Sequence, residues 1–371
     1  MRYVDEFRVP AAARELLREI EALDESGTFM EVCGTHTMGI SRAGLRPLLE
    51  PGIDLISGPG CPVCVTADTD IDRAMAVARE PDVIMTTFGD MMKVPGTEDS
   101  LASASAKGAR VRVVYSPLES LAIAGEEPGA RVVFLGVGFE TTAPAVAATM
   151  LEARSRSIDN FYVLSFHKLV PPALRALVAL EDFDVDGFIL PGHVSVIIGS
   201  DAYAFLPDEF SMPCVVTGFE VTDILQAILR LLKMRESGAA LEVEYSRVVK
   251  PEGNPKALDV MAQVFEPCDA EWRGLFTIPG SGLAIRGEFA AMDAGTWDVE
   301  LPEPAGSKGC RCGEILCGRI KPMDCPFFGG RCTPDSPVGP CMVSSEGTCA
   351  SYYLYTESGG PDARGEGGEL G

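Results

Sequence analysis

Cysteine is the residue type through which this sequence offers the most chemistry. Its twelve cysteines fall into a C-terminal group, a close pair and three isolated positions. In that order they are the seven from Cys310 to Cys349, then Cys61 and Cys64, and finally Cys33, Cys214 and Cys268. In a reducing compartment, cysteines are more often metal ligands or redox thiols than structural disulfides. The grouping therefore indicates reactive sites and not a disulfide framework.

The pair Cys61-Pro62-Val63-Cys64 has the spacing of a redox dithiol. It follows a Gly-Pro-Gly turn and precedes a helix that we expect to open near residues 66–70. A helix N-terminus stabilises a thiolate and so lowers the pKa of one sulfur, and two intervening residues let the pair close into a disulfide. Half of a zinc site and two inert buried thiols have the same spacing, which therefore leaves all three interpretations open.

Cys33 and His36 place a thiol and an imidazole three residues apart, directly after a predicted strand. Both are good ligands for iron. The alternative is a small buried cysteine beside a histidine that only makes hydrogen bonds. All three histidines of the chain, His36, His167 and His193, lie in loops after predicted strands. This placement favours a functional role for at least one of them.

The C-terminal group contains the series Cys325-x6-Cys332-x16-Cys349, and twelve residues separate Cys312 from Cys325. Four thiolates can hold a [4Fe–4S] cluster, and a proline follows Cys325 as it often follows cluster cysteines. A zinc site with four cysteine ligands is the chief alternative. Zinc ribbons and fingers usually use two CxxC pairs, which this segment lacks, so the spacing favours iron–sulfur over zinc. Disulfides are a third interpretation.

The elements that must position these residues follow a βα rhythm over residues 28–234. Continuous apolar runs of this kind suit the strands of parallel sheets, which are covered on both faces. The expected strands are 29–33, 53–57, 83–87, 111–115, 132–137, 162–166, 188–190 and 215–217.

This rhythm predicts two similar parallel-sheet α/β domains with a cleft between them. We expect domain I at 28–127, with the CGTH and CPVC motifs, and domain II at 128–240. A third, irregular and mostly helical domain at 241–356 would carry the Fe–S cluster, and an N-terminal helix within 1–27 would pack on it. Residues 357–371 lack apolar anchors and are expected to form a disordered tail.

Most of the chemically rich motifs directly follow a predicted strand. In open α/β sheets ligands bind at the carboxyl ends of the strands, so these loops should line a common cleft between the two domains. The alternative is that their Gly and Pro residues only turn the chain. The motifs are CGTH, GPGCPVC, FGDMMKVPG, GFETTAP, FHKLVPP and LPGHVSV.

Composition excludes several classes of protein. Of 371 residues, 46% are hydrophobic and 23% charged, as in a folded globular protein. The formal net charge of −23 and the lack of a long basic run disfavour nucleic-acid binding. No run approaches the ~20 apolar residues that cross a bilayer, and the N-terminus has no apolar signal-peptide core, so we expect a cytoplasmic protein. The absence of GxxxxGK[ST] and of a full GxGxxG opening a helix disfavours a nucleotide enzyme.

In this order the motifs resemble those of the HypD family of hydrogenase maturation proteins over nearly the whole chain. The matching segments are CGTH, GPGCPVCVT, FGDMMKVPG, GFETTAP, SFHKLVPPA, LPGHVSVIIG, GSGLAIRGEFAAMDA and CTPDSPVGPCMVSSEGTCA. The resemblance implies a third domain with a [4Fe–4S] cluster, and a complex with a HypC-type chaperone and a HypE-type cyanide-delivering protein. On that scaffold an iron atom would acquire one CO and two cyanides before passing to the hydrogenase large subunit.

The resemblance also implies roles for individual residues. Cys33 would be an iron ligand shared with a cysteine of the HypC-type chaperone, and His36 a ligand or proton-handling neighbour. Cys61 and Cys64 would be a thiol/disulfide pair that relays electrons from the cluster. The family's cluster ligands match Cys312, Cys325, Cys332 and Cys349.

This sequence departs from the family pattern by an excess of cysteines. Cys310, Cys317 and Cys341 lie close enough in sequence to compete as ligands, and Cys310 is the nearest substitute for Cys312. The first of the four ligands is thus the position that the resemblance defines least.

Two other classes of function fit the same residues. The first is a stand-alone Fe–S oxidoreductase or lyase acting on a small molecule in the interdomain cleft, and turnover without partners would favour it. The second is a binding module with a structural cluster and an inert CPVC pair. Retention of activity after replacement of Cys61 would favour that module.

Overall fold

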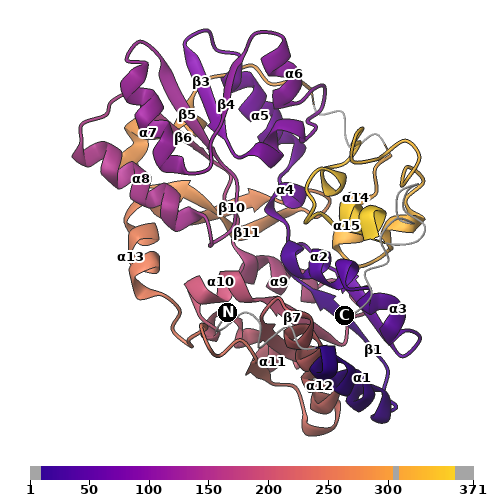
Figure 1. The fold of residues 1–371 in the computed structure, drawn as a ribbon. Helices are drawn as coiled ribbons and strands as arrows, with labels where there is room; N and C mark the ends of the chain where they lie inside the picture. The colour runs from indigo at the N-terminus through magenta and orange to yellow at the C-terminus, as the bar shows by residue number, and fades with distance from the viewer. Residues whose placement is uncertain (1–9, 304–308, 356–371) are drawn as a thin grey trace.

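Two parallel β-sheets, each with helices packed on it, organise the chain (Figure 1). The computed structural model describes residues 10–303 and 309–355. The first sheet has the strand order β2-β1-β7-β8-β9 and the second the order β4-β3-β5-β6. All neighbouring strands within these two sheets are parallel, which confirms the predicted α/β class.

The strands of the first sheet are β1 (Gly27–Glu31), β2 (Ile53–Ser57), β7 (Gly187–Pro191), β8 (Cys214–Thr217) and β9 (Leu241–Val243). Those of the second are β3 (Val83–Thr87), β4 (Arg110–Val113), β5 (Arg131–Gly136) and β6 (Phe161–Ser165). A separate antiparallel hairpin pairs β10 (Phe265–Glu271) with β11 (Thr277–Ile285).

The α-helices are α1 (Pro10–Ala22), α2 (Gly34–Arg42), α3 (Leu45–Leu49), α4 (Pro62–Val65), α5 (Asp68–Ala78), α6 (Leu101–Ala106), α7 (Pro117–Glu126), α8 (Ala143–Ser155), α9 (Val170–Val178), α10 (Gly192–Ile198), α11 (Phe205–Phe210), α12 (Val221–Ser237), α13 (Pro255–Val264), α14 (Cys312–Leu316) and α15 (Thr348–Tyr355). Short 3-10 helices are η2 (Gly89–Lys93), η3 (Asp201–Tyr203), η4 (Gly287–Met292), η5 (Ala294–Thr296), η6 (Pro322–Asp324) and η7 (Pro340–Met342).

Alternating side chains along each strand build cores on the two faces of each sheet. In β1, Phe29 packs into a core with helix α12, whereas its neighbour Met30 points into a core that extends across both sheets. In β5, Val133 joins that same shared core and Phe134 packs with helix α8. The shared core also contains most of the C-terminal cysteines, so the cysteine-rich segment is packed against both sheets.

The sheets do not follow the expected division of the chain at residues 127/128. Strands β1 and β2 pair with β7 and β8, while β3 to β6 form the other sheet, so 28–127 and 128–240 each contribute to both. The chain thus leaves the first sheet after β2 and returns to it with β7. A pattern of apolar runs indicates that strands exist but not which strands pair, because pairing depends on contacts far apart in sequence.

The expectation for the N-terminal helix is wrong in its partner. Helix α1 packs on helix α12 and not on the cysteine-rich segment. Its apolar residues Leu16, Leu17 and Ile20 join the core formed by α12 and the outer face of the first sheet. This is the packing that an amphipathic helix finds beside a long helix rich in leucine and isoleucine.

Residues after 241 are less irregular than expected. Strand β9 extends the first sheet, and the hairpin β10–β11 with helix α13 packs against helix α8 of the second sheet. The expected disordered tail at 357–371 lies outside the described residues. Within the described ranges, no helix has the length and apolar character required to cross a membrane.

Candidate functional site

The loops that follow strands β1 and β2 lie in direct backbone contact. The Gly34 N–H donates to the Gly60 carbonyl at 3.1 Å. A Cβ atom at Gly60 would lie only 2.2 Å from the Cys33 nitrogen, so this approach requires glycine. The CGTH and GPGCPVC motifs therefore form one unit at the carboxyl end of the first sheet.

Cys33 occupies the N-cap of helix α2 and is partly exposed. Its thiol is nevertheless crowded by protein, and burial raises the pKa of Cys33 to about 11, although hydrogen bonds from the backbone of His36 and Thr35 act in the opposite direction. The Thr35 hydroxyl donates to the Glu346 carboxylate at 2.7 Å. A loop of the cysteine-rich segment thus lies beside Cys33, and the nearby carboxylate of Glu346 disfavours a thiolate there.

His36 is fully buried and held in one orientation. Its Nε2 lies 2.7 Å from the Gly218 carbonyl oxygen, so Nε2 carries the proton and donates it to that bond. The other ring nitrogen, Nδ1, is buried without a hydrogen-bond partner. Burial lowers the pKa of His36 to about 4, which keeps the ring neutral. A neutral imidazole that donates to a backbone carbonyl is the state in which histidine binds metal ions.

Phe219 separates the imidazoles of two motifs. Its ring stacks on His36 at a centroid distance of 4.8 Å and on the exposed His193 at 3.9 Å. The histidines of the CGTH and LPGHVSV motifs therefore meet around one aromatic side chain. His167, by contrast, lies beside Phe265 of the β10–β11 hairpin, so it is not part of this group.

Cys61 and Cys64 are both buried and lie side by side. Cys61 is the N-cap of the one-turn helix α4, and the Cys64 N–H lies 3.4 Å from the Cys61 sulfur. The next helix, α5, begins only at Asp68. Burial raises the pKa of the Cys64 thiol well above its ordinary value, so the expectation of a lowered pKa does not apply to this sulfur.

Neighbouring thiols lead from this pair into the cysteine-rich segment. The Cys341 thiol lies next to both Cys64 and Cys312, and Cys312 lies next to Cys310. Cys341 lies in η7 and Cys312 begins α14. These sulfurs, named here the sulfur series, connect residues about 250 positions apart in sequence.

The sulfur series ends at a small pocket lined by thiols. Apolar side chains close the rest of its wall, among them Ile315, Phe327 and Phe328. The six cysteines that line it are Cys310, Cys312, Cys325, Cys332, Cys341 and Cys349. All four expected cluster ligands are therefore brought together, with Cys310 and Cys341 beside them. Cys317, although buried, is not part of this lining.

The donor set fits a [4Fe–4S] cluster, which binds only through thiolates and tolerates an apolar surround. Within 10–303 and 309–355, no three His, Cys, Asp or Glu side chains converge on a point suited to one metal ion. The four sulfurs around a cluster bind four separate irons and have no need to converge in this way. Four of the six cysteines that line this pocket could hold such a group, and the four that match the family pattern are Cys312, Cys325, Cys332 and Cys349.

Loops of the second sheet contact the same region. The Lys168 ammonium, from the FHKLVPP motif, lies 3.3 Å from the Asp70 carboxylate in the first turn of α5. Glu140, from GFETTAP, accepts a hydrogen bond from the Val170 N–H at 2.9 Å. The sequence analysis assigned no role to Glu140, Phe219 or Glu346. Glu140 and Phe219 each lie in a Gly-containing loop after a strand, whereas Glu346 lies between η7 and α15 beside Gly347; these glycines are the signal that could have drawn attention to them.

Glu140 should make stability depend on pH. Burial raises the pKa of its carboxyl from 4.5 to about 7. Below the unfolded pKa both states are protonated; between 4.5 and 7 only the unfolded state ionises, so stability falls as pH rises. We expect wild type to lose about 3 kcal/mol relative to Glu140→Gln between pH 4 and pH 8. Urea unfolding of both proteins across this range measures it, and a constant difference would contradict it.

The fold and site together define a class: an α/β protein with two parallel sheets in which a buried CPVC pair is joined by thiols to a cysteine-lined cavity. The chain belongs to the HypD family. The HypD family model, described as hydrogenase formation hypA family, matches residues 11–356.

Individual relatives agree with this assignment. The hydrogenase maturation factor HypD of Rhodobacter capsulatus is 45% identical over 370 residues, covering 96% of this chain and 98% of the relative. Its counterpart from Escherichia coli (strain K12) is 42% identical over 370 residues, with 96% and 99% covered. The protein of the same name from Azotobacter vinelandii is 44% identical over 367 residues, with 96% and 97% covered.

Proposed function

We propose that this chain is a maturation factor for [NiFe] hydrogenases that acts as a scaffold for the Fe(CN)2CO unit. It would work with a HypC-type chaperone and a HypE-type cyanide-delivering protein, before the unit passes to the hydrogenase large subunit. Membership of the HypD family supports the part of this proposal that concerns hydrogenase maturation. The residues around Cys33 and the sulfur series support the finer part.

The sulfur series is the observation that carries the proposal. It gives the buried Cys61–Cys64 pair a continuous route of contacts to the cysteine-lined cavity. A cluster held by Cys312, Cys325, Cys332 and Cys349 would supply single electrons when bound. Two electrons and two protons convert a Cys61–Cys64 disulfide into two thiols, and the reverse reaction returns them. A binding module with inert cysteines has no use for such a route.

The iron under assembly is a substrate, and Cys33 is the residue we propose to bind it. Cys33 is a partly exposed residue, unlike Cys61 and Cys64, and the thiol of a partner would approach the same metal from this exposed side. The unpartnered Nδ1 of His36 is a second donor or a proton acceptor on the same helix. Soft thiolate and imidazole donors suit iron that carries CO and cyanide.

Maturation in cells tests this proposal. Expressed with its own HypC-type and HypE-type partners and a cognate hydrogenase, the chain should support hydrogenase activity and co-purify with the HypC-type protein. Cys64→Ser should reduce that activity to the level without the chain, because the pair can no longer form a disulfide. Cys268→Ser, on strand β10 and outside the sulfur series, is the matched control and should keep full activity. Wild-type activity in Cys64→Ser would refute a redox role for the pair.

A further inference from the structure

The tip of the β10–β11 hairpin is wedged between the CPVC turn and the cysteine-rich segment. Trp272 forms an antiparallel bridge with Thr66, and the Arg273 N–H donates to the Val65 carbonyl at 2.9 Å. On the opposite side, Gly274 touches Gly313, the residue after Cys312. A Cβ atom at Gly274 would lie 2.0 Å from the Gly313 Cα, and the φ of +73° at Gly274 also favours glycine. Three consecutive residues thus contact the backbone just after Cys64 and just after Cys312.

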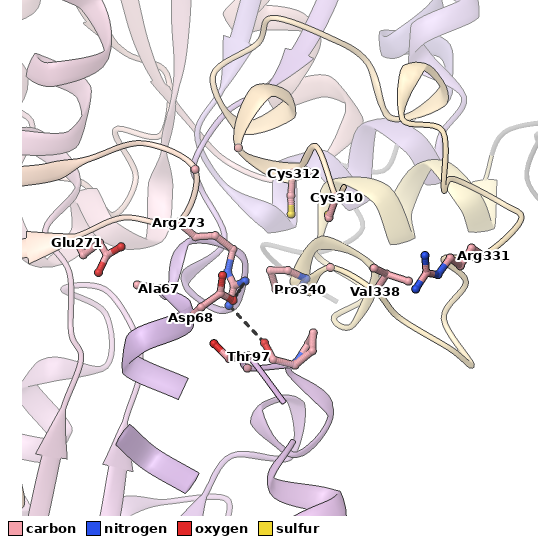
Figure 2. Close-up of a pocket in the computed structure, with 15 residues that line it drawn as sticks. Ala67, Asp68, Thr97, Glu271, Arg273, Cys310, Cys312, Arg331, Val338 and Pro340 are labelled. Atoms are coloured by element: carbon pink, nitrogen blue, oxygen red, sulfur yellow. Dashed lines mark hydrogen bonds and ion pairs between the residues drawn. The ribbon is translucent and has the colours of Figure 1, made fainter. Parts of the chain in front are cut away.

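The Arg273 side chain strengthens the contact on the CPVC side. It is only 9% exposed. Its Nε donates to the Thr66 carbonyl at 2.8 Å, Nη2 donates to the Pro95 carbonyl at 3.5 Å, and Nη1 pairs with the Asp68 carboxylate. Figure 2 shows Arg273 beside Asp68, with Cys310 and Cys312 on the wall of the same pocket.

These contacts join segments that lie apart in the sequence. Thr66 and Asp68 directly follow the CPVC helix α4, whereas Pro95 belongs to the FGDMMKVPG motif after strand β3. A planar guanidinium with several donors can satisfy three acceptors at fixed angles, whereas the single ammonium of lysine cannot. The contacts between the hairpin tip and the CPVC turn therefore depend on the shape of the arginine side chain as well as on its charge.

We propose that Arg273 is a positioning residue that sets the CPVC turn in register with Cys341 and Cys312. The inference rests on the proposed redox function, since register matters only if the sulfurs exchange electrons. Arg273 touches no sulfur itself. It fixes the backbone of Val65 and Thr66, and so the place of Cys64 relative to Cys341. Lys168 adds a second contact near the start of helix α5. Its ammonium pairs with the Asp70 carboxylate and donates to the Glu271 carbonyl at 2.6 Å.

Disulfide equilibrium between Cys64 and Cys341 measures this register directly. In a Cys61→Ser background, Cys64 has lost its partner in the CPVC pair, and Cys341 is its remaining neighbour in the sulfur series. The full chain is equilibrated without oxygen against mixtures of reduced and oxidised dithiothreitol. Each disulfide formed transfers two electrons and two protons to oxidised dithiothreitol, which opens to its dithiol. Alkylation and peptide mass mapping give the fraction of the Cys64–Cys341 disulfide.

We expect Arg273→Gln to lower the equilibrium constant for this disulfide about tenfold, equivalent to about 30 mV for a two-electron couple. Arg273→Lys should give a smaller decrease, because lysine keeps the positive charge but lacks the planar guanidinium with its several donors. Arg131→Gln is the matched control: Arg131 also forms ion pairs, with Glu80 and Asp82, but outside the CPVC turn, and its loss should leave the constant unchanged.

An unchanged constant in Arg273→Gln would overturn the proposal, as would an equal decrease in Arg131→Gln. Should Arg273→Gln not fold, Arg273→Lys and Asp68→Asn decide the matter, with a decrease of about threefold expected in each. Iron content is measured on the same samples. A wild-type protein without iron would count against the proposed cluster, while the disulfide equilibrium would still test Arg273.

Discussion

Replacing Cys33 by serine should abolish hydrogenase maturation while leaving the fold, the cysteine-lined cavity and partner binding intact. The reason is chemical: a hydroxyl is a hard, weakly acidic donor and a poor replacement for thiolate on iron that carries CO and cyanide. The change in volume is small, so the loss of folding stability should stay near 1 kcal/mol. A loss of function far larger than the loss of stability is the expected signature of a ligand.

Infrared spectroscopy distinguishes a ligand from a structural cysteine at this position. Wild-type protein isolated with its HypC-type partner should show bands of bound CO and cyanide, and Cys33→Ser isolated in the same way should show none. Cys214→Ser is the matched control, because Cys214 is buried in strand β8 and outside every motif. Persistent bands in Cys33→Ser would refute Cys33 as an essential iron ligand.

His36 should modify the same bands without being required for them. In His36→Gln the amide nitrogen can still donate to the Gly218 carbonyl, whereas His36→Ala also leaves that buried carbonyl without its present donor. We therefore interpret the His36→Gln spectrum as the effect of losing Nδ1, and His36→Ala as that effect combined with a structural one.

The strands could be predicted from the sequence, but their order in the sheets could not. All eight expected strands exist, because continuous apolar runs such as Val83–Thr87 identify strands covered on both faces. The pairing of β1 with β7 joins residues more than 150 positions apart, and no local pattern encodes it. Strand β11 was missed for the opposite reason, since Pro279, Gly280 and Gly282 interrupt its apolar pattern.

The candidate site also contains residues that the sequence predicted and residues that it did not. Spacing alone drew attention to Cys61, Cys64 and the C-terminal group, because a redox pair needs two neighbouring thiols and an Fe–S cluster needs several. The role of Cys341 as the contact between Cys64 and Cys312 could not be predicted, since it depends on η7 packing on helix α4. From the sequence, Cys341 was only one of three additional cysteines that could compete as cluster ligands. Arg273 lies outside every motif that the sequence singled out, and nothing in its neighbours indicated a contact with the CPVC turn.

The ligand set of the cavity can be tested by counting iron. Anaerobically purified wild type should contain about four irons per chain and absorb in the visible range. Cys214→Ala and Cys268→Ala each remove one thiol outside the cavity, and both variants should keep the iron and the visible absorption. Stoichiometric zinc without visible absorption in wild type would replace the cluster by the zinc alternative.

Cys325→Ala, Cys332→Ala and Cys349→Ala should each lose nearly all of this iron, because a [4Fe–4S] cluster held by three thiolates exposes one iron to solvent and to oxidation. The fourth position is where the excess of cysteines matters. Cys312 is buried, whereas Cys310 is only partly so, and both line the cavity. We expect Cys312→Ala to lose the iron and Cys310→Ala to retain it. The reverse result would make Cys310 the ligand and leave Cys312 as a thiol between the cluster and Cys341. In that case Cys341→Ala should keep its iron but slow the reduction of the Cys61–Cys64 pair.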